Sequence, residues 1–327
     1  RVSRGLGDVY KRQQYGGPDR FHQYYYTSGE EARYNFNQGG FNDSPFEQGF
    51  TNVAHIDVTT ADTSIHADHA IWTSQRVEAY NASHLKYGHS DAVSVTLSFW
   101  IKSTITGIYS ICYNHTNMDE RYITTYTVNV ANTWEKKTIT IPGDTRSGKN
   151  ISPSNGYGLE VKWVWMSGAN RLGNPNEWAT QGNVYGSQGV TLANIFSITS
   201  NNLYLTGCQL EVGSVATPFE HRSHGEELTR CQRYYQRVNG GLNGIGANST
   251  TIRANYVPIV NFRASPTITG SGGVAFNNPG VNTPTQSSFA CGLQYTYTPN
   301  NIGMTLGFGN FTNCLLYTSD AADDTCC

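Results

Sequence analysis

The chain has 327 residues, a formal net charge of −2, and only 14% charged residues against the roughly 25% of an ordinary globular domain. This composition excludes a polybasic nucleic-acid binder and an acidic tail, and the many aromatic and β-branched residues exclude a disordered chain. No run approaches the roughly 18 apolar residues of a membrane span, so we expect no transmembrane segment.

The two ends of the chain read differently from the rest. Residues 3–13 (SRGLGDVYKRQ) and 314–324 (CLLYTSDAADD) resemble in-frame translations of sequencing adapters. We therefore interpret 1–13 and 314–327 as adapter-derived, and the remainder as a fragment of a longer protein. Removing both ends takes away four basic and four acidic residues, so the net charge is unchanged. Four cysteines remain, and their spacing matches no zinc site.

Residues 14–220 consist of short segments in which apolar and polar residues alternate, broken by Gly, Asn, Pro and Asp. In the clearest, Phe99 and Ile101 fall on one face, whereas Trp100 and Lys102 fall on the other. Such alternation predicts β-strands at 68–77, 95–102, 108–114, 121–130, 134–141, 158–166 and 202–212. This number of strands predicts an all-β fold, an antiparallel β-sandwich of the jelly-roll type. Trp163 and Trp165 share the face of other apolar residues, so we expect them in the core.

A linking helix is predicted within 221–241. Ser223 and Glu226 have the spacing of a capping box. Apolar residues then recur at helical spacing as far as Val238, and 239–241 (NGG) supply a C-terminal cap. A second, smaller β domain is predicted over 242–313, with strands near 250–260, 265–270, 288–298 and 302–311.

Several segments together resemble a module that is frequent in tail and tail-fibre proteins of environmental bacteriophages. They are 59–64 (TTADTS), 97–103 (LSFWIKS), 133–139 (TWEKKTI), 209–213 (QLEVG), 216–222 (ATPFEHR) and 227–235 (ELTRCQRYY). The module is itself similar to the jelly-roll carbohydrate-binding modules of bacterial glycanases. The resemblance covers about 19–238.

The resemblance implies a non-catalytic virion tail-fibre or tail-associated protein that binds host-surface polysaccharide. Such a protein is extracellular, contacts other tail proteins and is commonly a homotrimer. The alternative is a glycan-binding accessory module of a secreted bacterial glycanase. Modules of this kind often carry a structural calcium ion, for which Asp57, Asp62 and Asp68 are acceptable oxygen donors.

Sugar recognition needs aromatic rings for the apolar faces of pyranoses and polar groups for the hydroxyls. Strand alternation places Trp72 and Trp100 on non-core faces, and two tyrosines flank a polar loop at 114–120. The predicted carbohydrate-binding residues are therefore Trp72, Trp100, Lys102, Tyr113 and Tyr122. The alternative for Trp100 is packing beneath a covering loop or a second sheet.

Other chemistries have weaker support in the sequence. Glycoside hydrolysis requires two carboxylates at a fixed separation, and no pair stands out among Asp119, Glu120, Glu160 and Glu211. The histidines lack metal-ligand spacing, so we predict no catalytic residue, no metal ligand and no cofactor. Residues 143–150 (GDTRSGKN) partly fit a phosphate-binding loop, but Asn150 replaces its hydroxyl residue. We predict a polar hairpin loop there and no nucleotide or nucleic-acid ligand.

Overall fold

The computed structural model describes residues 14–15, 21–26, 32–115, 119–240, 244–248, 251–256, 259–261, 267–270, 285–287, 291–296 and 311–317. The chain divides into two compact units, and the boundary falls between Arg222 and Ser223. Of the ends assigned to adapter, 1–13 and 318–327 lie outside the described residues, whereas 314–317 close a strand. The adapter assignment and the predicted domain limits stay predictions.

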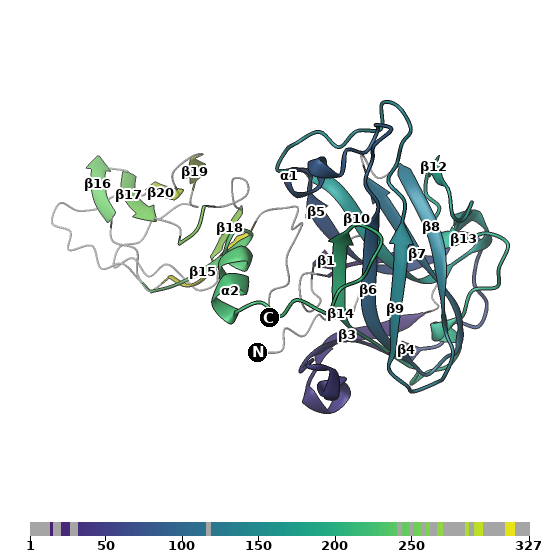
Figure 1. The fold of residues 1–327 in the computed structure, drawn as a ribbon. Helices are drawn as coiled ribbons and strands as arrows, with labels where there is room; N and C mark the ends of the chain where they lie inside the picture. Colours follow the sequence, from purple (N-terminus) through teal and green to yellow (C-terminus); the bar gives the residue numbers. More distant parts are fainter. Residues whose placement is uncertain are drawn as a thin grey trace. The chain divides into compact units, whose positions relative to one another are not determined.

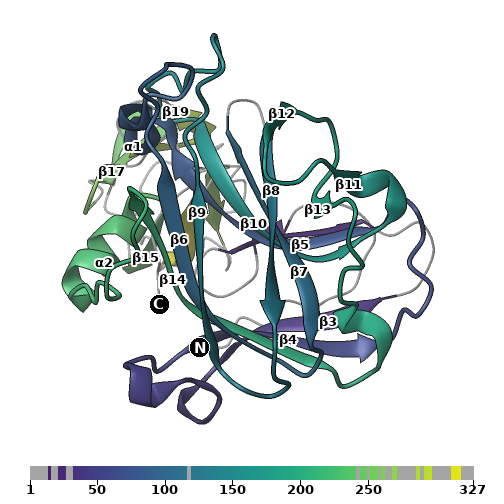
Figure 2. The ribbon, with the colours of Figure 1, turned by 45° about the vertical axis from the view of Figure 1, so that its right-hand side comes forward.

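The first unit is a β-sandwich of two antiparallel sheets (Figures 1 and 2). The seven-stranded sheet has the order β1 (Gln14–Tyr15), β2 (His22–Tyr26), β5 (Ala70–Glu78), β10 (Tyr157–Ser167), β7 (Gly107–His115), β8 (Glu120–Val128) and β12 (Trp178–Thr180). The five-stranded sheet has the order β3 (Arg33–Gly39), β4 (Val53–Thr60), β14 (Asn202–Val212), β6 (Val95–Ser103) and β9 (Glu135–Ile141).

Short elements connect the strands. A parallel pair joins β11 (Leu172–Gly173) to β13 (Gly186–Ser187). The helical turns are η2 (Phe41–Asp43), η3 (Phe46–Gln48), α1 (Ala79–Ala82), η4 (Ser83–Leu85), η5 (Ala169–Arg171) and η6 (Ile195–Ser197).

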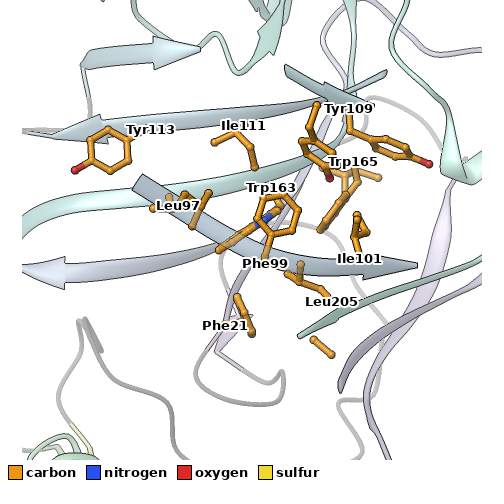
Figure 3. Packing of buried hydrophobic residues seen from close by; sticks show 14 of the residues in the cluster. Phe21, Leu97, Phe99, Ile101, Tyr109, Ile111, Tyr113, Trp163, Trp165 and Leu205 are labelled. Carbon is orange, nitrogen blue, oxygen red and sulfur yellow. The ribbon is translucent and has the colours of Figure 1, made fainter. Parts of the chain in front are cut away.

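The core lies between the two sheets and follows from strand alternation. The side chains of Leu97, Phe99 and Ile101 on β6 are at most 1% exposed. Trp163 of β10 packs edge-on against Phe99 and Phe21, with ring centroids 5.8 and 5.7 Å apart (Figure 3). Burial of such aromatic side chains contributes the largest apolar areas in a core. The core positions predicted for Trp163 and Trp165 are confirmed.

All seven strands predicted in the sandwich are present, at β5, β6, β7, β8, β9, β10 and β14. The hairpin predicted at 143–150 is wrong. The strands on either side of it belong to different sheets, because β9 pairs with β6 whereas β10 pairs with β5 and β7. The segment therefore crosses from one sheet to the other. Sequence alternation does not reveal which strands pair, so it could not distinguish a hairpin from a crossover.

The second unit begins with helix α2 (His224–Gln232). Its predicted N-cap is confirmed, since the Ser223 side chain accepts a hydrogen bond from the Glu226 backbone N–H at 3.3 Å. The predicted C-terminal part of the helix is wrong, because residues 235–240 form strand β15 and pair with β21. Tyr235 and Val238 suit a strand as well as a helix, and the backbone hydrogen bonds to β21 decide between them.

Two small sheets make up the described remainder of this unit. They contain β15 (Tyr235–Gly240), β21 (Phe311–Tyr317) and β18 (Thr267–Gly270) in one, and β16 (Gly244–Asn248), β17 (Thr251–Tyr256), β20 (Cys291–Thr296) and β19 (Thr285–Ser287) in the other. Strands β17, β18 and β20 coincide with three predicted windows. Most of the fourth window, 302–310, lies outside the described residues. The fold is all-β, with a short helix between a sandwich and a smaller β unit.

Candidate functional site

The five predicted carbohydrate-binding residues occupy three different environments. Trp100 and Lys102 lie half-buried on the outward face of the five-stranded sheet. Trp72 lies on the outward face of the other sheet, yet it is only 4% exposed. Tyr113 and Tyr122 pair across β7 and β8 with side chains in the core. Burial leaves Trp72, Tyr113 and Tyr122 with little surface for a ligand, which revises the predicted set.

The outward face of the five-stranded sheet gathers a group of half-buried aromatic and polar side chains. Strand register places Asn37, His55, Tyr204 and Lys102 in one row across β3, β4, β14 and β6. Trp134 continues the row, with its ring centroid 5.3 Å from the Lys102 Nζ. In Figures 1 and 2, β14, β6 and β9 run side by side. We call His55, Trp100, Lys102, Trp134 and Tyr204 the platform.

The ring of Tyr204 is enclosed by its neighbours in the row. The His55 ring stacks parallel to it at a centroid distance of 4.3 Å and an interplanar angle of 6°. The Lys102 Nζ also lies 4.3 Å from the same centroid. Because the stacked imidazole covers one face of the ring, the ammonium must lie over the other. Both faces of the Tyr204 ring are therefore covered.

The indole of Trp100 lies in a different setting. Its neighbours across the sheet are Thr206 on β14 and Lys136 on β9. Among the residues that the structure describes, no ring or cation packs on its faces. A hydroxyl and the side chains of two lysines, Lys136 and Lys102, border this half-buried indole.

Two polar groups of the platform make contacts with neighbouring segments. The His55 Nε2 lies 2.6 Å from the Asn202 Oδ1. The Lys102 Nζ donates to the Asp43 carbonyl at 3.5 Å. Burial lowers the pKa of Lys102, and the nearby Asp43 carboxylate opposes this effect. Ordered donors and acceptors beside an open aromatic ring are the ingredients of a sugar-binding surface.

Sequence reasoning missed three members of the platform. Tyr204 alternates with the buried Leu203 and Leu205, so its outward position was available from the period of the strand. Trp134 precedes β9 by one residue, and His55 alternates with buried residues of β4. What was missing was the register, which alone places these residues beside Lys102.

The outward face of the seven-stranded sheet carries a buried ionic cluster. The Glu160 carboxylate, 1% exposed, lies 2.5 Å from the Lys162 Nζ and 3.4 Å from the Arg76 Nε. Ser74 donates to it at 2.5 Å, and Lys162 also bonds to Asn114. Burial alone would raise the pKa of Glu160, but the two cations lower this pKa to about 2. The buried carboxylate is therefore paired with two cations and a hydroxyl, as a buried charge requires.

Trp72 belongs to the same face and is covered by other rings. The Tyr24 ring stacks on it at 3.9 Å and 12°, and the Tyr185 ring lies 4.1 Å away. With Val164 and Ile123 these residues form a second, smaller apolar cluster. Trp72 therefore has a packing role in this structure.

A third polar cluster joins the 143–150 segment to β8 and β12. The Glu120 carboxylate accepts from Arg146 at 2.7 Å and Lys149 at 2.6 Å, and Thr180 also donates to it. Asp144 lies 3.0 Å from His115, and neither side chain is exposed. These contacts explain the basic residues of the segment as anchors, with no need for a phosphate ligand.

Three of the candidate catalytic carboxylates, Glu120, Glu160 and Glu211, have lowered pKa values. Burial alone would raise the pKa of Glu120, but its contacts with Lys149, Thr180 and Arg146 lower this pKa below its usual value. Hydrogen bonds from Gln209 and Thr217 likewise lower the pKa of Glu211. A glycosidase needs one carboxyl group with a raised pKa to act as the acid. Neither these residues nor Glu160 has that property.

The described part of the chain lacks a candidate metal site. It contains no group of three or more His, Cys, Asp or Glu side chains arranged to hold a metal ion. The three aspartates suggested as calcium donors make separate contacts. Asp62 pairs with His69 at 3.2 Å, Asp68 bonds to Asn170, and Asp57 bonds to Asn35. Within the same residues, no helix is both long and apolar enough to cross a bilayer.

No protein-family model matches the chain. No curated protein matches it either.

Solved structures with a similar arrangement include the enzymatically active domain of tailspike protein 4 of bacteriophage CBA120, at 13% identity and a TM-score of 0.31. That match covers 58% of this chain and 18% of the tailspike chain. A family 11 carbohydrate-binding module from Clostridium thermocellum, in complex with a mixed-linked tetrasaccharide, matches at 13% identity and a TM-score of 0.29, over 60% of this chain and 91% of the module. A putative sugar-binding protein from Bacteroides thetaiotaomicron matches at 8% identity and a TM-score of 0.29. That match covers 58% of this chain and 87% of the Bacteroides protein. Similarities this distant carry no argument about function.

Proposed function

We propose that the β-sandwich binds glycans through the platform and does not cleave them. The observation that carries the proposal is the half-buried indole of Trp100. Its faces are free of described rings and cations, and Thr206, Lys136 and Lys102 surround it. The apolar face of a pyranose can stack on this indole while the surrounding groups bond to its hydroxyls.

The absence of cleavage is proposed from the electrostatics of the carboxylates. Glu120, Glu160 and Glu211 all have lowered pKa values, and each is held by a different set of cations or hydroxyls. A carboxyl group that stays ionised cannot protonate a leaving glycosidic oxygen near neutral pH.

Affinity electrophoresis of the full chain tests glycan binding. The probes are neutral polysaccharides (β-glucans, xylan, mannan and agarose) and bacterial O-antigen and capsular polysaccharides. We expect retardation by at least one of them, and a loss of about tenfold or more in affinity in Trp100→Ala, the size of an interface hot spot. The matched control is Tyr80→Ala, an aromatic residue that is 57% exposed on α1, near the end of the other sheet.

Two results would overturn the proposal. One is no retardation by any probe, and the other is equal binding by Trp100→Ala and the unaltered chain. Release of reducing sugar from a bound polysaccharide would contradict the non-catalytic part alone.

The biological setting is proposed from the sequence resemblance: a virion tail-fibre or tail-associated protein that contacts host-surface polysaccharide outside the cell. The alternative is an accessory module of a secreted glycanase. The flanking sequence distinguishes them, because neighbouring tail genes support the first and an adjoining glycanase domain supports the second. Light scattering on the purified chain tests the trimer that the fibre interpretation expects.

A further inference from the structure

The segment between β3 and β4 carries two exposed phenylalanines. Phe41, at the start of η2, is 56% exposed, and Phe46, at the start of η3, is 51% exposed. Their ring centroids are 4.3 Å apart. Leaving two adjacent aromatic side chains in water is unfavourable, and such pairs in a polar surface commonly mark a contact with a ligand.

The same segment lies against the platform. Asp43, the last residue of η2, accepts a hydrogen bond from the Lys102 Nζ through its backbone carbonyl. Its side chain lies over Gly39, where an added Cβ would come within 3.1 Å of the Asp43 Oδ2. Because Gly39 shares the outward face with Asn37, η2 is placed on the ligand side of the sheet. In Figures 1 and 2 this segment is the dark purple coil beside β3.

Strand spacing sets the distance from Trp100 to the end of β3, after which the segment with Phe41 and Phe46 begins. Trp100 is on β6, and β6 is separated from β3 by β14 and β4. Three inter-strand spacings amount to about 14 Å. The interval contains the stacked rings of Tyr204 and His55, and also the Lys102 ammonium, the Thr206 hydroxyl and the Asp43 carbonyl. This distance exceeds one sugar ring, so a glycan that reaches both positions must contain several sugar units.

We propose that the Phe41–Phe46 pair is a second stacking position for the same glycan, so that the site takes a stretch of several sugar units running across the strands. The inference rests on the proposed function of the platform. It excludes a single sugar as the complete ligand, because a single sugar would fill only one of the two aromatic positions.

Isothermal titration of the full chain tests this proposal. The titrants are the polysaccharide that the electrophoresis identifies and its oligosaccharides, from the disaccharide upward. For the unaltered chain, affinity is expected to rise with oligosaccharide length and then level off. The double variant Phe41→Ala/Phe46→Ala is expected to keep its affinity for the shortest ligand that binds and to lose about tenfold for long ones.

Four further results are informative. Trp100→Ala should weaken short and long ligands alike, and Tyr80→Ala should weaken neither. If affinity rises with oligosaccharide length equally in the unaltered chain and in the double variant, the proposed second stacking position is wrong, but the proposed platform is not contradicted. If the unaltered chain binds no ligand of any length, both proposals fall. Circular dichroism verifies that the double variant is folded, as expected for two exposed side chains.

Discussion

Replacing Glu160 with Gln is expected to destabilise the sandwich by about 3 kcal/mol. The carboxylate is 1% exposed and forms ion pairs with Lys162 and Arg76, both of which are buried. Its pKa falls from 4.5 to about 2 on folding. At about 1.4 kcal/mol per pH unit this difference corresponds to roughly 3 kcal/mol. Breaking a buried ion pair by removing one partner costs a similar amount, about 3–5 kcal/mol.

The pH dependence of this stabilisation has a definite sign. Because the folded-state pKa of Glu160 lies below the unfolded value, its contribution is complete above about pH 4.5 and is lost as the pH falls toward 2. The difference in unfolding free energy between the unaltered chain and Glu160→Gln should therefore shrink from about pH 7 to about pH 3.

Urea unfolding followed by tryptophan fluorescence measures this difference. All six tryptophans lie between residues 72 and 178, so the signal reports the sandwich alone. The control is Glu47→Gln, at an exposed position in η3, for which we expect a change within about 0.5 kcal/mol. A loss below about 1 kcal/mol, the value of a surface ion pair, would refute the reasoning. So would a difference that stays constant with pH.

Two further substitutions test the packing of the sandwich. Trp163→Ala removes a side chain that is 1% exposed between the sheets and should cost about 3–5 kcal/mol in urea unfolding; a cost near zero would mean that this core is not packed as described. Gly168→Ala places a Cβ 2.1 Å from the His66 carbonyl oxygen and should cost at least about 2 kcal/mol. Gly182→Ala, whose Cβ meets no atom within 4 Å, is its control, and equal melting temperatures for the two glycine variants would contradict the second prediction.

Local patterns in the sequence predicted most of the sandwich. The period of two along β6 and β10 identified their core faces correctly, because successive side chains of a strand point to opposite faces of the sheet. The N-cap at Ser223 was also predictable, since a cap depends only on residues within one turn. These features are determined over a few residues, so sequence alone suffices for them.

The end of α2 and the path of 143–150 required long-range information. Tyr235 and Val238 fit a helical stripe, yet pairing with β21 makes them part of a strand. The segment at 143–150 looks like a hairpin loop until the partners of β9 and β10 are known. In both cases hydrogen bonds between residues distant in sequence decide the local structure.

The candidate site shows the same division most clearly. Alternation placed Trp72 and Trp100 equally on outward faces, and nothing in either strand distinguishes them. Tertiary structure separates them, because Tyr24 and Tyr185 cover Trp72, whereas no described ring covers Trp100. The sequence by itself determined which way each side chain points from its strand. Only the packing of distant segments decided which of those side chains a ligand can reach, since exposure depends on what the rest of the chain lays over each face.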